Sequence, residues 1–417
     1  MHVAETRILD AIDDAETVNL LADAIRVPSV TGTDAESELL HHYAGLFGEA
    51  DLDVDLWKLD LERLCARPDF PGIEAPRSEG YGLVGVTEGE GTPALILQGH
   101  VDVVPTGDLT KWKGSDPFAP RITGDTLHGR GACDMKAGLV ANLAVVRALR
   151  RSGIRLARPL ALHCVISEED GGLGAFATLA RGHTGEAAVI TEPTSGTVIT
   201  ANAGALTFRI EVPGRAAHGA SRQEGVSAIE VFWPLFQAIR RLEGERNRDL
   251  PAVFAGNALP YPIEVGTVRA GDWSSSVPDL LVAEGRLGVR LGEDPAEARA
   301  AFEQALAEAA GSWLRDNPPV VTWPGGQFAS GRLPAGHELL DQVNAVVAEV
   351  RGSVPAESAA PYGSDLRLYN GGGIPTLHYG PGDVRFAHAP REQVELSELR
   401  EVTRALALLV VRRCGIR

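Results

Sequence analysis

Continuous apolar runs separated by helical patterns dominate the first 200 residues of the chain. The runs in "LVGV", "ALILQGH", "PLALHCVIS" and "AAVITE" lack the regular polar positions of a strand with one solvated face, and segments with helical periodicity lie among them. Strands of this kind are buried on both faces, which is typical of parallel sheets in α/β domains. We therefore predict an α/β domain with a buried, largely parallel sheet.

The strand pattern changes near Asn202. "LTFRIEV" and "LVAEGRLGVRL" alternate apolar and polar residues, so each predicts a strand with one buried face. A helix lies between them, and its apolar face consists of Ile229, Phe232, Phe236 and Ile239. A second helix begins near Pro295, and the order βαββαβ predicts a ferredoxin-like α+β domain over residues 202–317. This domain interrupts a discontinuous α/β domain made of residues 1–201 and 318–417.

The charge and the cysteines limit the classes of partner. The formal net charge of −17 disfavours nucleic acid and anionic membranes. The apolar stretch "ALALLVV" is far shorter than the roughly 20 residues that span a bilayer. The 4 cysteines lie apart without a CxxC pair, which indicates free thiols in a reducing compartment. We expect a cytoplasmic protein. The net charge says little about small substrates, because a local site can carry the opposite field to the whole surface.

Residues that can bind metal ions follow the predicted buried strands. His100 and Asp102 end one strand, and because positions i and i+2 of an extended chain point to the same side, Asp102 could hold the imidazole of His100. Glu168 and Glu169 follow the next strand, and Glu192 follows the one after that. Ligands of open α/β sheets gather at the carboxyl ends of the strands, so we expect these side chains at one sheet edge.

Two further residues could complete this cluster. Asp134 lies in a Gly-rich turn just before a helix, where an N-cap is the structural alternative. His388 lies in a loop before the last helix. So many carboxylates need cations, and imidazole and carboxylate ligands suit Zn²⁺ as well as Mn²⁺ or Co²⁺. Two metal ions about 3.5–4 Å apart need a bridging carboxylate, for which Asp134 is the candidate.

Five segments of the chain resemble the motifs of a known family. "GHVDVVP", "GRGACDMKAG", "SEED", "ITEP" and "FAHAPREQV" are similar, in the same order, to motif segments of the M20 dinuclear zinc amidohydrolases. That family includes acetylornithine deacetylase, succinyl-diaminopimelate desuccinylase, glutamate carboxypeptidase and aminoacylase. The resemblance spans almost the whole chain. It implies a zinc-peptidase-like catalytic domain, with the inserted domain serving as a lid and dimerisation domain.

The resemblance also implies a role for each matching residue. The ligands implied for one metal ion are His100, Asp134 and Glu192. Those implied for the other are Asp134, Glu169 and His388. Glu168 would be the general base, which deprotonates a water bridging the two ions and later protonates the leaving amine. Asp102 would orient His100, whereas Asp170 matches no role in the family.

Three residues elsewhere have family counterparts. In "VPGRAAHGA", His218 corresponds to a histidine that reaches the partner's active site across a dimer and stabilises the tetrahedral oxyanion, so the resemblance implies a functional homodimer. Arg367 corresponds to the arginine that binds the substrate carboxylate, with an ordinary surface arginine as the alternative. Ser276 stands where the family often has Asn, and a hydroxyl offers one donor where an amide offers two.

The sequence therefore predicts a homodimeric, metal-dependent hydrolase that cleaves the amide bond of an N-acyl amino acid. "HYGPGDVRFAHAP" resembles acetylornithine deacetylase most closely. A carboxypeptidase, a dipeptidase or a succinyl-diaminopimelate desuccinylase is the alternative with the same chemistry. A catalytically silent relative that binds an amino acid or metal is the remaining alternative. The presence of Glu168 argues against it, because binding alone requires no base.

Overall fold

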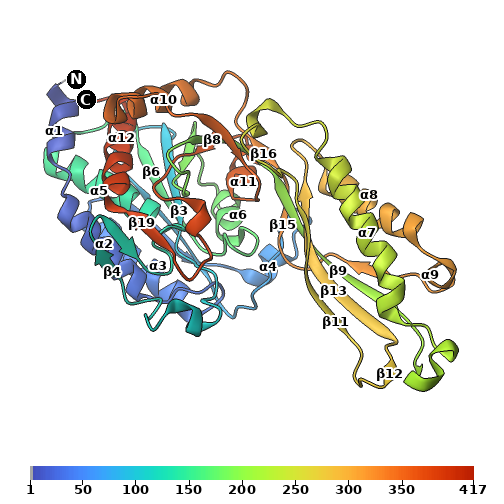
Figure 1. Ribbon diagram of the computed structural model, residues 1–417. Helices are drawn as coiled ribbons and strands as arrows, with labels where there is room; N and C mark the ends of the chain where they lie inside the picture. Colours follow the sequence, from blue (N-terminus) through green and yellow to red (C-terminus); the bar gives the residue numbers. More distant parts are fainter. Residues whose placement is uncertain (1–2) are drawn as a thin grey trace. The chain divides into compact units, whose positions relative to one another are not determined.

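The chain forms two compact units in the structure, a computed structural model that describes residues 3–417. Unit 1 contains the residues up to Thr200 together with Arg332–Ser358 and Asp365–Arg417. Unit 2 contains Ala201–Gly331 and Ala359–Ser364. Figure 1 labels many of the elements of both units. The chain thus has the predicted α/β class. The α+β unit 2 is inserted into the discontinuous α/β unit 1.

Unit 1 is built on a nine-stranded mixed sheet with the order β1-β2-β6-β3-β7-β18-β8-β16, in which β17 also pairs with β8. The strands are β1 (Asp53–Lys58), β2 (Tyr81–Val86), β3 (Leu95–His100), β6 (Leu160–Val165), β7 (Ala188–Ile190), β8 (Val198–Asn202), β16 (Gly331–Arg332), β17 (Glu357–Ala360) and β18 (Thr376–His378). Strands β6, β3, β7 and β18 run parallel, whereas β1, β2 and β8 join through antiparallel pairs. The parallel prediction is correct for the central strands and wrong for β2, which contains "LVGV".

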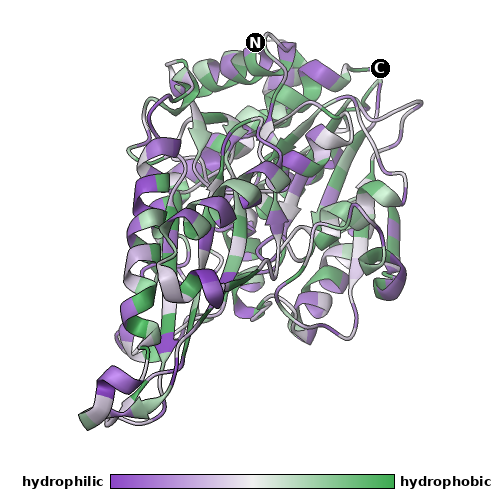
Figure 2. Ribbon diagram, turned by 90° about the vertical axis from the view of Figure 1, so that its right-hand side faces the viewer, coloured by the Kyte–Doolittle hydropathy of each residue, from purple (hydrophilic) through white to green (hydrophobic). Residues whose placement is uncertain are grey.

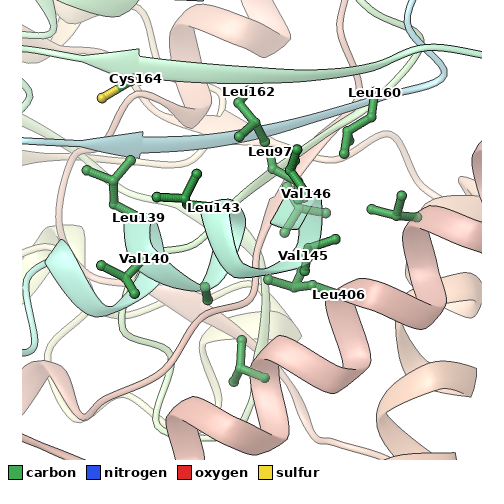
Figure 3. Packing of buried hydrophobic residues seen from close by; sticks show 14 of the residues in the cluster. Leu97, Leu139, Val140, Leu143, Val145, Val146, Leu160, Leu162, Cys164 and Leu406 are labelled. Carbon is green, nitrogen blue, oxygen red and sulfur yellow. The ribbon is translucent and has the colours of Figure 1, made fainter. Parts of the chain in front are cut away.

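Apolar side chains cover both faces of the parallel strands. The largest buried cluster includes residues of α3 (Asp34–Glu49), α5 (Lys136–Ser152), α10 (Glu338–Arg351) and α12 (Leu396–Cys414). Another cluster joins the alternate residues of β3 and β6 to residues of α6 (Leu173–Ala180) and α11 (Leu366–Gly371). Figure 3 shows Leu139 and Leu143 of α5 pointing toward the strands that carry Leu97 and Leu162. Every residue of β3 and β6 is buried, as continuous apolar runs predict.

A small sheet in unit 1 connects two segments that carry predicted ligands. It consists of β4 (Arg121–Thr123), β5 (Thr126–His128) and β19 (Gln393–Glu395). Because β19 pairs antiparallel with β5, the segment after His388 lies beside the segment that leads to Asp134. The unit also contains α1 (Val3–Asp10), α2 (Asp14–Arg26), α4 (Leu61–Cys65) and the 3₁₀ helices η1 (Leu109–Trp112) and η4 (Val384–Phe386).

Unit 2 has the predicted order βαββαβ. Its main elements are β9 (Gly204–Pro213), α7 (Ala228–Arg246), β11 (Ile263–Ala270), β13 (Leu280–Val289), α8 (Pro295–Ala309) and β14 (Val320–Thr322). The sheet order is β11-β13-β9-β14 with antiparallel pairs, which is the ferredoxin-like arrangement. The alternating apolar residues of β9 are buried, and α7 and α8 cover this face of the sheet (Figure 1). The smaller elements are β10 (Ala217–His218), η2 (Gly219–Glu224), η3 (Ala252–Phe254), β12 (Ser276–Val277), α9 (Ser312–Asp316) and β15 (Gln327–Phe328).

Two details of unit 2 differ from the sequence-based expectation. The expected boundary at residue 317 lies too early, because β14 and β15 both pair with β9 and the chain returns to unit 1 only at Arg332. Ile229 was expected on the buried face of α7 but is 53% exposed. The neighbouring Ala228 is buried instead, and adjacent helical residues point about 100° apart, so Ile229 faces outward.

The helices of both units are amphipathic. Figure 2 shows purple and green segments next to each other along their ribbons, as expected for helices that bury one side and expose the other. Among residues 3–417, no helix has the combination of length and apolar character needed to cross a membrane.

Candidate metal centre

Three neighbouring parallel strands bring predicted ligands to one edge of the unit 1 sheet. Strand β3 ends at His100. Strand β6 is followed by the turn that contains Glu168 and Glu169, and strand β7 is followed by Glu192. Because β3 pairs in parallel with both β6 and β7, the carboxyl ends of all three strands are adjacent. Open α/β sheets bind their ligands at this edge.

Asp134 belongs to two groups of candidate ligands. The ligand atoms of each group lie within 4.8 Å of one another, and the groups are His100, Asp134 and Glu192, and Asp134, Glu169 and His388. Oδ1 of Asp134 lies 3.2 Å from Nε2 of His100, and Oδ2 lies 3.4 Å from Nε2 of His388. The two oxygens of one carboxylate therefore face different histidines, an arrangement that can bridge two metal ions.

The third residue of each group contacts the histidine of that group. Oε1 of Glu192 lies 3.6 Å from Nε2 of His100. Oε2 of Glu169 lies 3.0 Å from Nε2 of His388. The five side chains that were expected to bind metal thus lie together, although they come from segments that are far apart in the sequence.

Burial and mutual repulsion oppose the charges of these carboxylates. Burial, followed by the charge of Asp134, raises the pKa of Glu192 well above its usual range and also raises that of Glu169. Burial and the charge of Glu192 raise the pKa of Glu168 in the same way. Burial alone would also raise the pKa of Asp134, but hydrogen bonds from the two imidazoles hold it low. Positive charge at this edge would relieve the repulsion.

The donors fit divalent metal ions. Within residues 3–417, the buried Oε1 of Glu169 has no hydrogen-bond partner, which is unusual for a carboxylate oxygen removed from solvent. The two groups offer imidazole nitrogens and carboxylate oxygens and no thiolate, a set that suits Zn²⁺, Mn²⁺ or Co²⁺. A cation at each group would compensate charges that burial otherwise disfavours.

Asp102 connects His100 to the turn that carries Glu168. Nδ1 of His100 lies 2.9 Å from the backbone oxygen of Asp102 and 3.5 Å from its Oδ1, so the main chain makes the closer contact. The Asp102 carboxylate accepts hydrogen bonds from the backbone N–H groups of Glu168 and Glu169, each at 3.2 Å, and from the Thr31 hydroxyl at 3.0 Å. Asp102 therefore orients the backbone beside Glu168 as well as the imidazole.

Sequence reasoning did not select Glu392, which supports the Asp134 loop. Its Oε1 accepts hydrogen bonds at 2.9, 3.1 and 3.1 Å from the backbone N–H groups of Gly131, Cys133 and Asp134. Its Oε2 lies 2.5 Å from Nη1 of Arg130. Glu392 is an acid four residues after His388 in a quoted motif, which is the only sequence feature that singles it out.

Arg367 lies in α11 beside the turn that carries Glu168, and it is not a surface residue. Its residue exposure is 6%, and its Nη2 donates a hydrogen bond to the Gly171 backbone oxygen at 2.7 Å. Burial lowers its pKa to about 10, while the charges of Asp365 and Glu168 act in the opposite direction. The structure thus rules out the surface alternative for Arg367 and places its charge near Glu168.

The two predicted site residues of unit 2 face each other. His218 on β10 and Ser276 on β12 are directly paired in a two-stranded antiparallel ribbon, and both are exposed. Nδ1 of His218 accepts a hydrogen bond from the backbone N–H of Ala220 at 3.1 Å. In the neutral imidazole this contact places the proton on Nε2, which can then donate to another molecule.

Comparison with known proteins supplies the family. The family model described as "Peptidase family M20/M25/M40" matches residues 96–412. An N-formyl-4-amino-5-aminomethyl-2-methylpyrimidine deformylase from Halalkalibacterium halodurans is 28% identical over 394 residues, which cover 88% of this chain and 86% of that protein. An acetylornithine deacetylase from Proteus mirabilis is 25% identical over 409 residues, which cover 95% of this chain and 96% of that protein.

The fold has counterparts among solved structures. A di-peptidase from Saccharomyces cerevisiae has a TM-score of 0.76 at 13% sequence identity, over 98% of each chain. This likeness shows the fold alone, whereas the family match over residues 96–412 shows the family. The chain belongs to peptidase family M20/M25/M40 and is a metallohydrolase that acts on amide bonds.

Proposed function

We propose that this protein hydrolyses the amide bond of a small N-acyl compound, with an N-acyl amino acid similar to acetylornithine as the first candidate substrate. The observation that carries the proposal is the pair of ligand groups sharing Asp134 next to a buried acid, Glu168. The similarity to an acetylornithine deacetylase over 95% of this chain supports the candidate substrate.

Two zinc ions are the proposed cofactors. One would be held by His100, Asp134 and Glu192, and the other by Asp134, Glu169 and His388. When bound, the ions would polarise the amide carbonyl and lower the pKa of water. Two observations support this assignment. Within residues 3–417, the buried Oε1 of Glu169 has no hydrogen-bond partner, and the two carboxylate oxygens of Asp134 lie near different histidines.

Glu168 is the proposed general base. It takes a proton from the water that attacks the carbonyl carbon, and it delivers that proton to the amine nitrogen as the C–N bond breaks. Burial and the charge of Glu192 raise the pKa of Glu168 above the usual range of a carboxyl group, which makes its carboxylate a stronger base. Hydrogen bonding of the Glu168 backbone to Asp102 would hold the base in place.

The proposed assembly is a homodimer formed through unit 2. Strand β11 is an edge strand of its sheet, and an edge strand presents unpaired backbone groups that a second copy can bind. On α7, Ile229 and Trp233 are 53% and 60% exposed, respectively. Burying such apolar side chains between copies would stabilise the dimer.

In that dimer, His218 is proposed to act on the partner's substrate. Its Nε2 would donate a hydrogen bond to the oxyanion that develops when water adds to the amide carbonyl. The contact from the Ala220 backbone to Nδ1 supports this role, because it leaves the proton on the outward nitrogen. Arg367 and Ser276 are the proposed substrate contacts.

An N-formyl amine is the second candidate substrate. The pyrimidine deformylase from Halalkalibacterium halodurans is 28% identical to this chain, which is a higher identity than that of the acetylornithine deacetylase. Carboxypeptidase, dipeptidase and desuccinylase activities remain alternatives with the same chemistry. A cytoplasmic location stays a prediction, and it accords with the free state of all four cysteines.

A substrate screen tests the proposal. N-acetylornithine, other N-acetyl and N-succinyl amino acids, N-formyl-aminomethylpyrimidine and dipeptides are incubated with the enzyme in the presence of Zn²⁺, Co²⁺ or Mn²⁺. We expect turnover of an N-acyl compound that a chelator abolishes and that Glu168→Gln reduces at least about 1,000-fold. Turnover that survives chelation, or full activity of Glu168→Gln, would refute the mechanism.

A further inference from the structure

We propose that Glu36, Arg77 and Asp170 are positioning residues that hold the turn carrying Glu168. This inference rests on the proposed role of Glu168 as the base. It assigns a task to Asp170, for which neither the sequence nor the family resemblance offered one. The three residues form a buried network of ion-pair and hydrogen-bond contacts that joins three segments of unit 1.

The turn needs support because its backbone is unusual. Ser167 has a φ of 62°, in the left-handed region that non-glycine residues rarely adopt. Such conformations persist only where the surrounding structure enforces them. Asp102 accepts hydrogen bonds from the next two backbone N–H groups, those of Glu168 and Glu169. The residues before and after this pair, Ser167 and Asp170, are held by other groups.

Glu36 holds the beginning of the turn. It lies in the first helical turn of α3 and is 2% exposed. Its Oε1 accepts a hydrogen bond from the backbone N–H of Ser167 at 2.9 Å, and its Oε2 accepts one from Gly32 at 3.2 Å. The side chain therefore connects the start of α3 to the residue with the unusual φ.

Asp170 holds the end of the turn. It is 5% exposed, so it is not the solvated acid that its place after a strand would suggest. Its Oδ2 accepts hydrogen bonds from the backbone N–H groups of Glu74 and Ala75 at 3.2 and 2.8 Å. Its Oδ1 accepts a hydrogen bond from the Ser167 hydroxyl, which closes the turn on itself.

Arg77 connects the two acids. Its Nη1 lies 2.8 Å from Oε2 of Glu36, and its Nη2 lies 3.6 Å from Oδ1 of Asp170. The side chains of Arg77, Glu36 and Asp170 are only 2%, 2% and 7% exposed. Asp170→Asn removes a negative charge beside the buried guanidinium of Arg77 and weakens the contacts that Asp170 makes, so it should loosen the turn.

The consequence for catalysis follows from where the network ends. The network holds Ser167 through Glu36 and Asp170, and Ser167 and Asp170 flank the base Glu168 and the ligand Glu169. These contacts are made to residues on either side of the base and not to its carboxyl group. A displacement of about 1 Å in a catalytic group can cost about 100-fold in rate. Loss of the network should therefore lower kcat by moving Glu168, with little effect on KM.

The test is Asp170→Asn in two backgrounds. In the otherwise native enzyme with saturating Zn²⁺, we expect kcat to fall about 10-fold to 100-fold while KM changes less than about 3-fold. In the Glu168→Gln background, we expect the residual rate to change less than about 2-fold, because the base through which Asp170 acts is already absent. Metal content and melting temperature are measured for each variant.

Asp69→Asn is the matched control. It makes the same chemical change in the loop that also carries Arg77, in an exposed ion pair with Arg67, and should leave kcat unchanged. Arg77→Lys keeps the positive charge and replaces Asp170→Asn as the test variant if Asp170→Asn fails to fold. We expect it to lower kcat by a smaller factor in the native background and to leave the residual rate of Glu168→Gln nearly unchanged.

Two results would overturn the inference. One is an unchanged kcat for Asp170→Asn in the native background. The other is an equal fractional loss in both backgrounds, which would mean that the network only stabilises the fold. Full activity of Glu168→Gln alone would instead refute the proposed base, so the two failures can be told apart.

Discussion

His218 and Ser276 are directly opposed across the β10–β12 ribbon of unit 2, with both side chains exposed. Nδ1 of His218 caps the start of η2 by accepting a hydrogen bond from the Ala220 backbone, and this contact does not involve Nε2. The two residues of unit 2 that are expected to contact substrate therefore lie on one short surface element. A role in catalysis requires that this element meet an active site.

The first prediction tests whether His218 acts across a dimer. His218→Ala should lower kcat about 100-fold or more with a small change in KM, since an oxyanion contact is made mainly in the transition state. Mixing His218→Ala with Glu168→Gln subunits should restore about a quarter of the native activity, because half of the dimers would contain one complete site. Absence of any recovery, with subunit exchange verified, would show that His218 does not serve the partner.

The second prediction concerns Ser276. Ser276→Ala removes the hydroxyl from the strand facing His218 and should raise KM several-fold with kcat nearly unchanged if the hydroxyl contacts substrate equally in the ground and transition states. Steady-state kinetics on the preferred substrate measures this. Identical parameters for Ser276→Ala and the native enzyme would remove Ser276 from the substrate site.

The third prediction concerns metal stoichiometry. Because Asp134 belongs to both ligand groups, Asp134→Asn should lose both metal ions, whereas Glu192→Gln and His388→Ala should each retain about one. Elemental analysis after gel filtration gives the ratio of metal to protein. Equal losses in all three variants would contradict the assignment of Asp134 as the shared ligand.

The fourth prediction concerns the dimer interface. Val268 on the edge strand β11 is 50% exposed, and Val268→Lys places a charge on a strand that is proposed to meet a second copy. The variant should shift the protein toward monomers in analytical ultracentrifugation and lose activity together with the dimer. Thr123→Lys on the exposed strand β4 of unit 1 is the control and should leave the sedimentation unchanged.

The fifth prediction uses a buried histidine away from the metal site. Burial lowers the pKa of His163 to about 3, and its Nδ1 lies 2.8 Å from the Tyr369 hydroxyl. Between pH 3 and its unfolded pKa of about 6.5, the unfolded chain binds a proton that the folded protein does not. The free energy of unfolding therefore rises with pH through this window, and His163 should make it about 2 kcal/mol lower at pH 5 than at pH 8.

Denaturant unfolding of His163→Asn measures this contribution. The difference between native and variant unfolding free energies should change by about 2 kcal/mol between pH 5 and pH 8. Tyr369→Phe removes the hydrogen bond but keeps the imidazole, so it should shift the native curve without removing its slope. Parallel curves for the native protein and His163→Asn would show that His163 does not titrate as its burial implies.

Much of the site could be predicted because three of the five candidate ligands lie at or just after the end of a recognisable strand. His100, Glu169 and Glu192 lie at or after ends of buried parallel strands, and parallel neighbours place such ends at one edge. The inserted βαββαβ unit was predictable for a similar reason, since strict alternation marks strands with one buried face. Its end was placed too early, at residue 317, because β14 and β15 both pair with β9 and unit 2 continues to Gly331.

The supporting residues could not be predicted from local patterns. Glu392 contacts the Asp134 loop across more than 250 positions of sequence, and Asp170 contacts Ala75 across 95. In the sequence, both look like acids in polar turns. Their burial and their hydrogen bonds exist only after distant segments have packed together.

The sequence by itself determined the types of ligand and the strand ends that carry them, because periodicity and local chemistry are properties of neighbouring residues. The tertiary structure decided which oxygen of Asp134 faces which histidine, and it turned Asp170 from an unassigned acid into part of a buried network. Those outcomes depend on distances between remote segments, and the packing of the whole unit sets these distances.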